Sequence, residues 1–296
     1  MKTNVRRNLI QTCLLAALLA LPAVVQAQFT YITNNGAIAI TGYAGPPWAV
    51  TIPTNINGLP VTSIVDFAFD GTSLTGATIP EGVVNIGGAS FEGCTNLMSV
   101  LIGNSVAKIG NYTFDGCINL AHVTIGDSVT NIGYFAFNGC ISLTSVTIPS
   151  TVTSIIDYAF LGCFNLTSIY FKGNAPVADW TVFLPQDGFD SYFASAYYLP
   201  DTTGWSDFSA NTGIPALPWL PLIQTTGDTS FGVRTNQFGF NITWAGGQTV
   251  VVEACTNLAN PVWFPVATNT LASDSVYFSD PQSSNVPARF YRLRAP

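Results

Sequence analysis

The chain has 296 residues, and its composition of 48% hydrophobic against 8% charged residues is too apolar for a disordered protein. Such a chain can bury a sizeable core, and we expect it to fold. Its formal net charge of −7 gives an acidic surface that repels phosphate backbones, so we expect no nucleic-acid partner.

The chain begins with the features of a secretion signal. A basic start is followed by an apolar run that Pro22 interrupts, and Val25-Gln26-Ala27 places a small residue where a signal peptidase would cut. The run is short for a membrane anchor, so we expect cleavage after Ala27 and a secreted or cell-surface protein. No later stretch is long and apolar enough to span a bilayer, and we expect no transmembrane segment in the mature chain.

The middle of the chain repeats itself every 23 residues. The stretch VTIGDSVTNIGYFAFNGCISLTS at 123–145 is followed at once by VTIPSTVTSIIDYAFLGCFNLTS at 146–168, and four uninterrupted units fill 77–168. A short fixed period predicts a solenoid whose stacked rungs share one core. Within a unit, inward positions such as Val146 and Ile148 predict one short parallel strand per rung.

Every repeat contains a cysteine and a phenylalanine at fixed places. They form a structural ladder of two columns: Cys94, Cys117, Cys140 and Cys163; Phe91, Phe114, Phe137 and Phe160. Stacked equivalents point the same way into a crowded turn, which favours reduced cysteines packed as small apolar side chains. Disulfides remain an alternative, since rungs lie ~4.8 Å apart and a secreted location permits them. Thiols on a line cannot surround one zinc ion tetrahedrally.

The complete pattern of one unit has the specificity of a family signature. At 143–166 it reads L-x-x-V-x-I-P-x-x-V-x-x-I-x-x-x-A-F-x-G-C-x-x-L, which resembles the BspA-like leucine-rich repeat of bacterial surface proteins. The resemblance covers 50–172, including a degenerate unit at 50–74. It implies an extracellular or cell-surface protein that binds other macromolecules without catalysis.

The outward strand positions form a stripe of mostly small, hydroxyl-bearing side chains. They are Ser99, Leu101, His122, Thr124, Ser145, Thr147, Ser168 and Tyr170. Such residues favour sheet formation. They also make a flat, weakly polar surface on which an extracellular protein or polysaccharide could lie, and we take them as the candidate contact face.

Aromatic residues follow the repeats. They predict a cap over the last open rung at 169–212. The alternative interpretation is a carbohydrate-binding accessory protein in which exposed rings stack on sugar, with four candidate residues: Trp180, Tyr197, Tyr198 and Trp205. The proline-rich stretch GIPALPWLPL at 213–222 then suits a stiff, extended linker.

The last part of the chain alternates apolar and polar residues. The segments 237–244 and 248–255, joined by Gly246-Gly247, predict a β-hairpin, and WFPVAT, SVYFSD and RFYRLR predict three more short strands. Together they indicate a small antiparallel β-sandwich. The ending ARFYRLRAP resembles the carboxy-terminal β-module found on many large secreted bacterial proteins.

We therefore expect a mainly β protein, in which a leucine-rich repeat solenoid with parallel strands precedes a small antiparallel β-sandwich-like domain. The predicted segments are the signal peptide 1–27, the N-terminal cap with the degenerate repeat 28–76, the four repeats 77–168, the C-terminal cap 169–212, the linker 213–222 and the β-module 223–296.

The residues needed for common enzyme chemistry are missing from the pattern. The only histidine is His122, on the outward side of the strands, and without a second histidine and a placed acid neither a hydrolase triad nor a histidine metal site can be assembled. Asp70, Glu92 and Asp115 share a column, which we interpret as a solvated turn, with a calcium ladder as the alternative. We expect no catalytic residue, metal or cofactor.

Overall fold

The computed structural model describes residues 28–184, 194–225, 231–234, 237–244, 246–285 and 288–294. The predicted signal peptide at 1–27 lies outside these residues. The chain divides into two compact units, which we call the repeat unit (Met1–Tyr197 with Thr202–Leu217) and the C-terminal unit (Tyr198–Asp201 with Pro218–Pro296).

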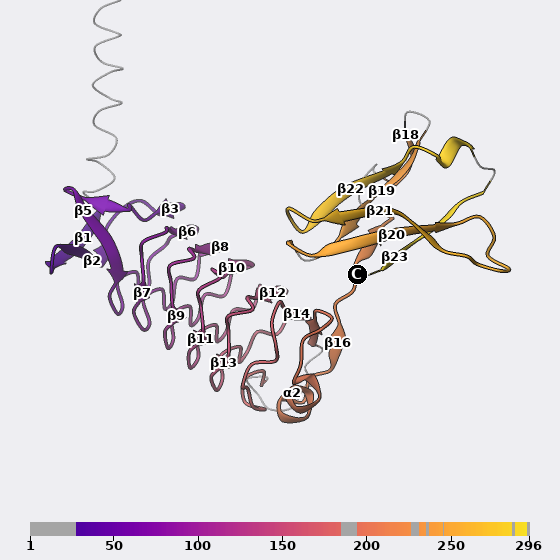
Figure 1. Ribbon diagram of the computed structural model, residues 1–296. Helices are drawn as coiled ribbons and strands as arrows, with labels where there is room; N and C mark the ends of the chain where they lie inside the picture. The colour runs from indigo at the N-terminus through magenta and orange to yellow at the C-terminus, as the bar shows by residue number, and fades with distance from the viewer. Residues whose placement is uncertain are drawn as a thin grey trace, which may run out of the picture. The chain divides into compact units, whose positions relative to one another are not determined.

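Two rows of short parallel strands run along the repeat unit (Figure 1). The first row comprises β3 (Val50–Thr51), β6 (Gly76–Ile79), β8 (Ser99–Ile102), β10 (His122–Thr124), β12 (Ser145–Ile148) and β14 (Ser168–Phe171). The second row comprises β5 (Leu59–Ile64), β7 (Asn85–Ile86), β9 (Lys108–Ile109), β11 (Asn131–Ile132) and β13 (Ser154–Ile155). Residues pair with their equivalents one repeat later, as Val100 does with Val123, so every column of the sequence becomes a column in space. The repeats thus form two strands per rung, one more than predicted.

An antiparallel hairpin starts the repeat unit. Its strands are β1 (Phe29–Asn34) and β2 (Ala37–Tyr43), and β2 pairs in parallel with β5, which also pairs with β4 (Asn55–Ile56). The turn residues Asn35 and Gly36 both have positive φ, 49° and 76°, as the tightest hairpin turns require. This hairpin covers the first rung and so caps the array.

The phenylalanine column forms a continuous stack in the core. Phe91, Phe114, Phe137 and Phe160 are fully buried, and their neighbouring rings are 5.2–5.4 Å apart and within 21° of parallel. The stack continues to Phe69 at one end and to Phe183 at the other. At both ends the angle between neighbouring ring planes becomes large: it is 74° between Phe29 and Phe69, and 67° between Phe208 and Phe183.

The cysteine column lies beside the rings and joins successive rungs. Each thiol of the column donates a hydrogen bond to the main-chain oxygen of the stacked phenylalanine in the preceding rung, as Cys117 Sγ does to Phe91 O at 3.2 Å and Cys140 Sγ to Phe114 O at 3.3 Å. The five cysteines of the described residues are buried and unlinked. Burial raises the pKa of the Cys140 thiol, so the proton needed for this hydrogen bond is retained.

The array is longer than the four repeats of 77–168. Residues 169–184, predicted as part of the cap, add another rung: Val177 bridges Ser154 in parallel, and Phe183 stacks on Phe160. The sequence period fades here because Ala178 stands where the preceding rungs have isoleucine.

Three elements cover this last rung. They are β15 (Ser195–Tyr198), α2 (Trp205–Thr212) and β16 (Ala216–Pro218). Trp205 and Phe208 of α2 pack against the ring of Phe171, at 4.9 and 5.4 Å between centroids. The segment 213–222, predicted as a linker, contributes β16, which pairs with β15.

The C-terminal unit consists of two antiparallel sheets. One contains β17 (Leu222–Gln224), β18 (Gly232–Arg234), β19 (Gln237–Thr243) and β22 (Ser275–Asp280); the other contains β20 (Thr249–Cys255), β21 (Phe264–Thr270) and β23 (Phe290–Arg294); a short 3-10 turn spans Ser283–Asn285. Phe240 and Ile242 from the first sheet meet Val250 and Val252 from the second in a shared core. The predicted fold class, a parallel-strand solenoid followed by antiparallel sheets, is confirmed.

The predicted hairpin of 237–244 with 248–255 is wrong. Within the described residues, β19 pairs with β17, β18 and β22, whereas β20 pairs with β21 and β23. The reason is a tertiary contact at the turn: Trp244 N donates to Asp274 O, and Gly247 N donates to Leu271 O. These bonds carry the chain from one sheet to the other.

Candidate functional site

The residues of the predicted contact face lie together on the first row of strands. Ser99, Leu101, His122, Thr124 and Ser145 are exposed, while Thr147, Ser168 and Tyr170 are half-buried. They stand in register, with His122 beside Ser99 and Tyr170 beside Thr147. Strand alternation explains the arrangement, because intervening residues such as Val146 point into the core.

This face has hydrogen-bonding groups without charged side chains. Leu101 is its most apolar exposed member, with 46% of its surface accessible. Tyr170 stacks on Tyr197 of β15 at 5.2 Å between centroids, which extends the face toward the end of the array. Its chemistry suits surface contact more than catalysis, since the residues of the face include no carboxylate or thiol beside the imidazole of His122.

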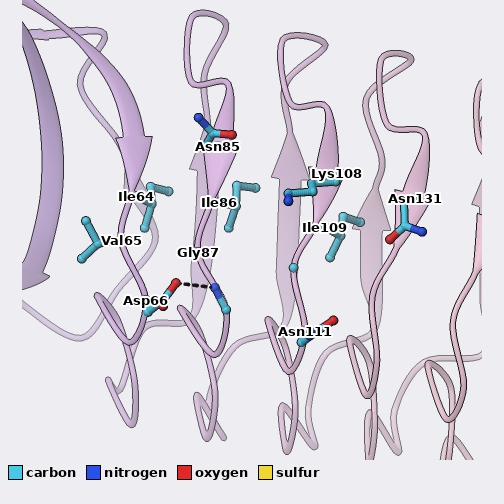
Figure 2. Close-up of a pocket in the computed structure, with 12 residues that line it drawn as sticks. Ile64, Val65, Asp66, Asn85, Ile86, Gly87, Lys108, Ile109, Asn111 and Asn131 are labelled. Atoms are coloured by element: carbon cyan, nitrogen blue, oxygen red, sulfur yellow. Dashed lines mark hydrogen bonds between the residues drawn. The ribbon is translucent and has the colours of Figure 1, made fainter.

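A hollow of about 770 Å³ lies over the second row of strands (Figure 2). Asn85, Lys108 and Asn131, the first residues of β7, β9 and β11, lie along one side of it. Asp66 and Asn111, from the turns that follow the strands, lie along the other side. Sequence reasoning missed this site because its polar residues fall in two columns whose residue type changes from rung to rung.

Glycines border the hollow between its two sides. Gly87 and Gly110 follow the strands, and a Cβ on Gly87 would overlap the backbone of Asp66 in the preceding rung. A Cβ on Gly110 would lie 3.2 Å from Ile86 O, so close packing of the rungs also favours glycine there. At these two positions no side chain covers the backbone that borders the hollow.

A stripe of aromatic residues borders the repeats and was also missed. Its members stand two positions before a phenylalanine of the buried ring stack: Phe67, Tyr112, Phe135 and Tyr158. Tyr112 stacks on Phe135 at 5.3 Å and Phe135 on Tyr158 at 5.1 Å. All four have positive φ between 53° and 60°, a region that bulky side chains rarely adopt. The aromatic signal is present in the sequence, but Ala89 interrupts it.

Burial and like-charge repulsion both act on the acidic column of Asp70, Glu92 and Asp115. Burial, followed by the charges of Asp115 and Asp70, raises the pKa of Glu92. The carboxylate of Asp115 accepts a hydrogen bond from Asn138 Nδ2 at 2.7 Å. Across the residues that the structure describes, no group of three or more histidines, cysteines or acids is arranged to hold a metal ion, so the calcium-ladder alternative gains no support.

The four residues of the carbohydrate alternative have different environments. Trp180 is 62% exposed, but Trp205 is only 5% exposed and donates its indole N–H to Thr202 Oγ1. Tyr197 and Tyr198 belong to different compact units. Trp205 serves the cap and is not available as a sugar platform.

Three arginines of the C-terminal unit form ion pairs. Arg292 Nε and Arg294 Nε lie 2.7 and 3.1 Å from the two oxygens of Glu253. The hydrogen bond from Arg292, with that from Arg294, lowers the pKa of Glu253. Arg289 pairs with Asp280 at 3.0 Å, and both side chains are buried.

Among the described helices, none is long and apolar enough to cross a membrane.

Comparison with known families agrees with this architecture. The family described as "BspA type Leucine rich repeat region" matches residues 62–184 in six copies. No curated protein matches the chain.

Several solved structures are also similar to this chain. A leucine-rich repeat protein of T. pallidum is 28% identical with a TM-score of 0.51, over 59% of this chain and 85% of that one. A leucine-rich repeat protein of Bacteroides ovatus is 24% identical with a TM-score of 0.48, over 65% of this chain and 52% of that one. The pneumococcal vaccine antigen PcpA is 18% identical with a TM-score of 0.51, over 64% of this chain and 47% of that one.

Proposed function

Residues 62–184 form a BspA-type leucine-rich repeat region, and from this premise we propose that the protein is secreted or held at the cell surface, where it binds another protein without catalysis. The contact face of the first strand row is its binding surface. The amino-terminal 27 residues, with their basic start and Ala27, support export from the cytoplasm.

The single observation that carries this proposal is the regular exposure of the contact face. Thr124 lies beside Leu101 in the preceding rung, and Ser145 beside Ser168 in the following one. The backbone beneath is held by parallel pairing and by the buried ring stack, so the face is preorganised and a partner need not order it. Uncharged hydroxyl groups cost less to desolvate than charged ones, which suits contact with a protein surface.

The test measures binding of the mature chain, starting at Gln28, to an array of purified extracellular-matrix and bacterial surface proteins, with a glycan array as a parallel arm. The face variant carries Thr124→Arg and Ser145→Arg. The matched control carries Thr95→Arg and Ser128→Arg, which change the same residue types at exposed positions away from the face.

We expect the face variant to bind its protein target at least about tenfold more weakly, because two bulky charges would lie in the contact. The control should stay within about twofold of the wild type. Protein binding that survives in the face variant would refute the assignment of the face. Binding to glycans with no bound protein would refute the proposed partner class.

A further inference from the structure

The hollow over the second strand row is a separate feature from the contact face, and its opening depends on one glycine. Asp66, Gly88, Asn111 and Tyr134 occupy the same place in four successive rungs. Asp66 Oδ1 accepts a hydrogen bond from Gly88 N at 2.8 Å, and Asn111 Oδ1 accepts one from Tyr134 N at 3.0 Å. Side chains in this column thus cap the backbone one rung further on.

Gly88 breaks that series because it has no side chain. Within the described part of the chain, the N–H of Asn111 has no hydrogen-bond acceptor. The missing side chain also leaves open the space between Asp66 and Asn111, which is part of the hollow. The result is a recess that offers a backbone donor.

The polar groups around the recess are both donors and acceptors. Asn85 and Lys108 are exposed on one side, and Asp66 and Asn111 are exposed on the other. Asn131 completes the first side, so amides outnumber charged groups, with one carboxylate and one ammonium among the lining residues. The site therefore has almost no net charge, although the protein as a whole is acidic.

Two residues of the recess are each followed in the chain by an exposed aromatic residue. Phe67 follows Asp66 and is 61% exposed, and Tyr112 follows Asn111 and is 38% exposed. Both have positive φ, 59° and 58°, where asparagine or glycine would be less strained. Tyr112 is held in place by stacking on Phe135, whereas Phe67 has the larger exposed surface.

We propose that the hollow binds a short, neutral oligosaccharide. Planar amide and carboxylate groups can pair with the neighbouring hydroxyls of a sugar, Lys108 and Asn111 N can donate to its oxygens, and exposed rings can pack on its C–H surfaces. A highly anionic ligand does not suit a site that contains Asp66 and only one cation. A peptide has no room to add as a strand here, since β7 pairs with β5, β9 pairs with β11, and β7 and β9 lie in contact with each other.

The decisive variant is Gly88→Asn, which places in this rung the residue that the next rung already has. Gly88 has no left-handed φ, and an added Cβ would lie 3.3 Å from Asn111 O, so a small adjustment accommodates it. The new side chain would occupy the recess, and its oxygen would accept the N–H of Asn111. Gly71→Asn is the matched control, because a Cβ there meets nothing within 4 Å and asparagine tolerates its φ of 61°.

The assay is isothermal titration of the mature chain with cello-, xylo-, manno- and laminari-oligosaccharides, and with heparin fragments and an unstructured peptide as comparison ligands. We expect one neutral oligosaccharide series to bind, Gly88→Asn to weaken it at least about tenfold, and Gly71→Asn to leave it unchanged. Hydrogen exchange at the Asn111 amide should slow in Gly88→Asn, which would show that the variant is folded and capped.

If Gly88→Asn fails to fold, the double variant Asn85→Ala and Asn131→Ala replaces it, with the same expected loss of affinity. The proposal is overturned if no neutral oligosaccharide binds, if only heparin or the peptide binds, or if a folded variant keeps full affinity. The Thr124→Arg and Ser145→Arg variant should bind the sugar normally. Failure of the proposed function and failure of this inference are therefore distinguishable.

Discussion

Replacing Phe137 tests whether the ring stack holds the solenoid together. Its side chain is fully buried, and it stacks on Phe114 at 5.3 Å and on Phe160 at 5.2 Å. Its main-chain oxygen accepts the thiol of Cys163 from the following rung. A change of this ring therefore affects three successive rungs.

Two substitutions separate burial from stacking. Phe137→Ala should lower the free energy of unfolding by about 3–5 kcal/mol, toward the upper limit, because rigid rings on both sides prevent collapse of the cavity. Phe137→Leu keeps most of the buried apolar surface but loses two ring pairs, each of about 0.5–1.5 kcal/mol, so its cost should be about 1–3 kcal/mol. Phe183→Leu also loses two ring pairs, with Phe160 and with Phe208, so its cost should fall in the same range.

Hydrogen exchange followed by mass spectrometry suits this measurement, because the chain has two compact units and need not unfold in one step. Peptides from 123–168 should exchange faster in both Phe137 variants, with peptides from 249–280 as the internal reference. A Phe137→Leu effect below about 0.5 kcal/mol, the lower limit for one aromatic pair, would show that the column fills space and that ring stacking adds nothing.

Further predictions concern close packing, pH and the thiols. Gly126→Ala should destabilise the repeats by about 1–3 kcal/mol in urea unfolding, because a Cβ there would overlap the main-chain oxygen of Gly103. Folding raises the pKa of Glu92, so its ionised form opposes folding: the contribution of Glu92 to stability should increase as the pH falls from neutral toward the ordinary carboxyl pKa of about 4. Glu92→Gln should raise the melting temperature at neutral pH and reduce that gain; an unchanged pH dependence would contradict the assignment. The five buried cysteines should resist iodoacetamide in the native protein and react in concentrated guanidinium chloride, as mass spectrometry would show; fast native modification of Cys140 would contradict its burial.

The columns of the solenoid could be predicted because each repeat places the same residue in the same surroundings. Phe114 and Cys117 recur with the period, so their burial and stacking follow from the sequence. The second strand row could not be predicted, since two residues such as Asn85-Ile86 are too short to show alternation. In the C-terminal unit, Gly246-Gly247 signals a hairpin locally, but the bonds from the neighbouring turn to residues 271–274 override it.

The contact face and the hollow differ in how far the sequence could reveal them. Alternation of Ser145 and Val146 is enough to place the face. The hollow, by contrast, depends on a departure from the pattern at Gly88. The effect of this glycine can be recognised only from the structure, in which the side chains of Asp66 and Asn111 each accept a backbone hydrogen bond from the next rung. A repeat pattern predicts the residues that recur in every rung, whereas this recess depends on one residue, Gly88, that differs from its equivalents.

The crossed rings at the ends of the stack limit the length of the molecule. A parallel aromatic column with open ends can accept another ring from a second molecule, and such head-to-tail addition does not close on itself, so it produces fibres. Phe29 and Phe208 lie at 74° and 67° to the terminal rings of the column, so each presents an edge where a parallel face would be needed. These two side chains therefore close the aromatic column within one chain, and a second copy meets a ring edge at either end of the column.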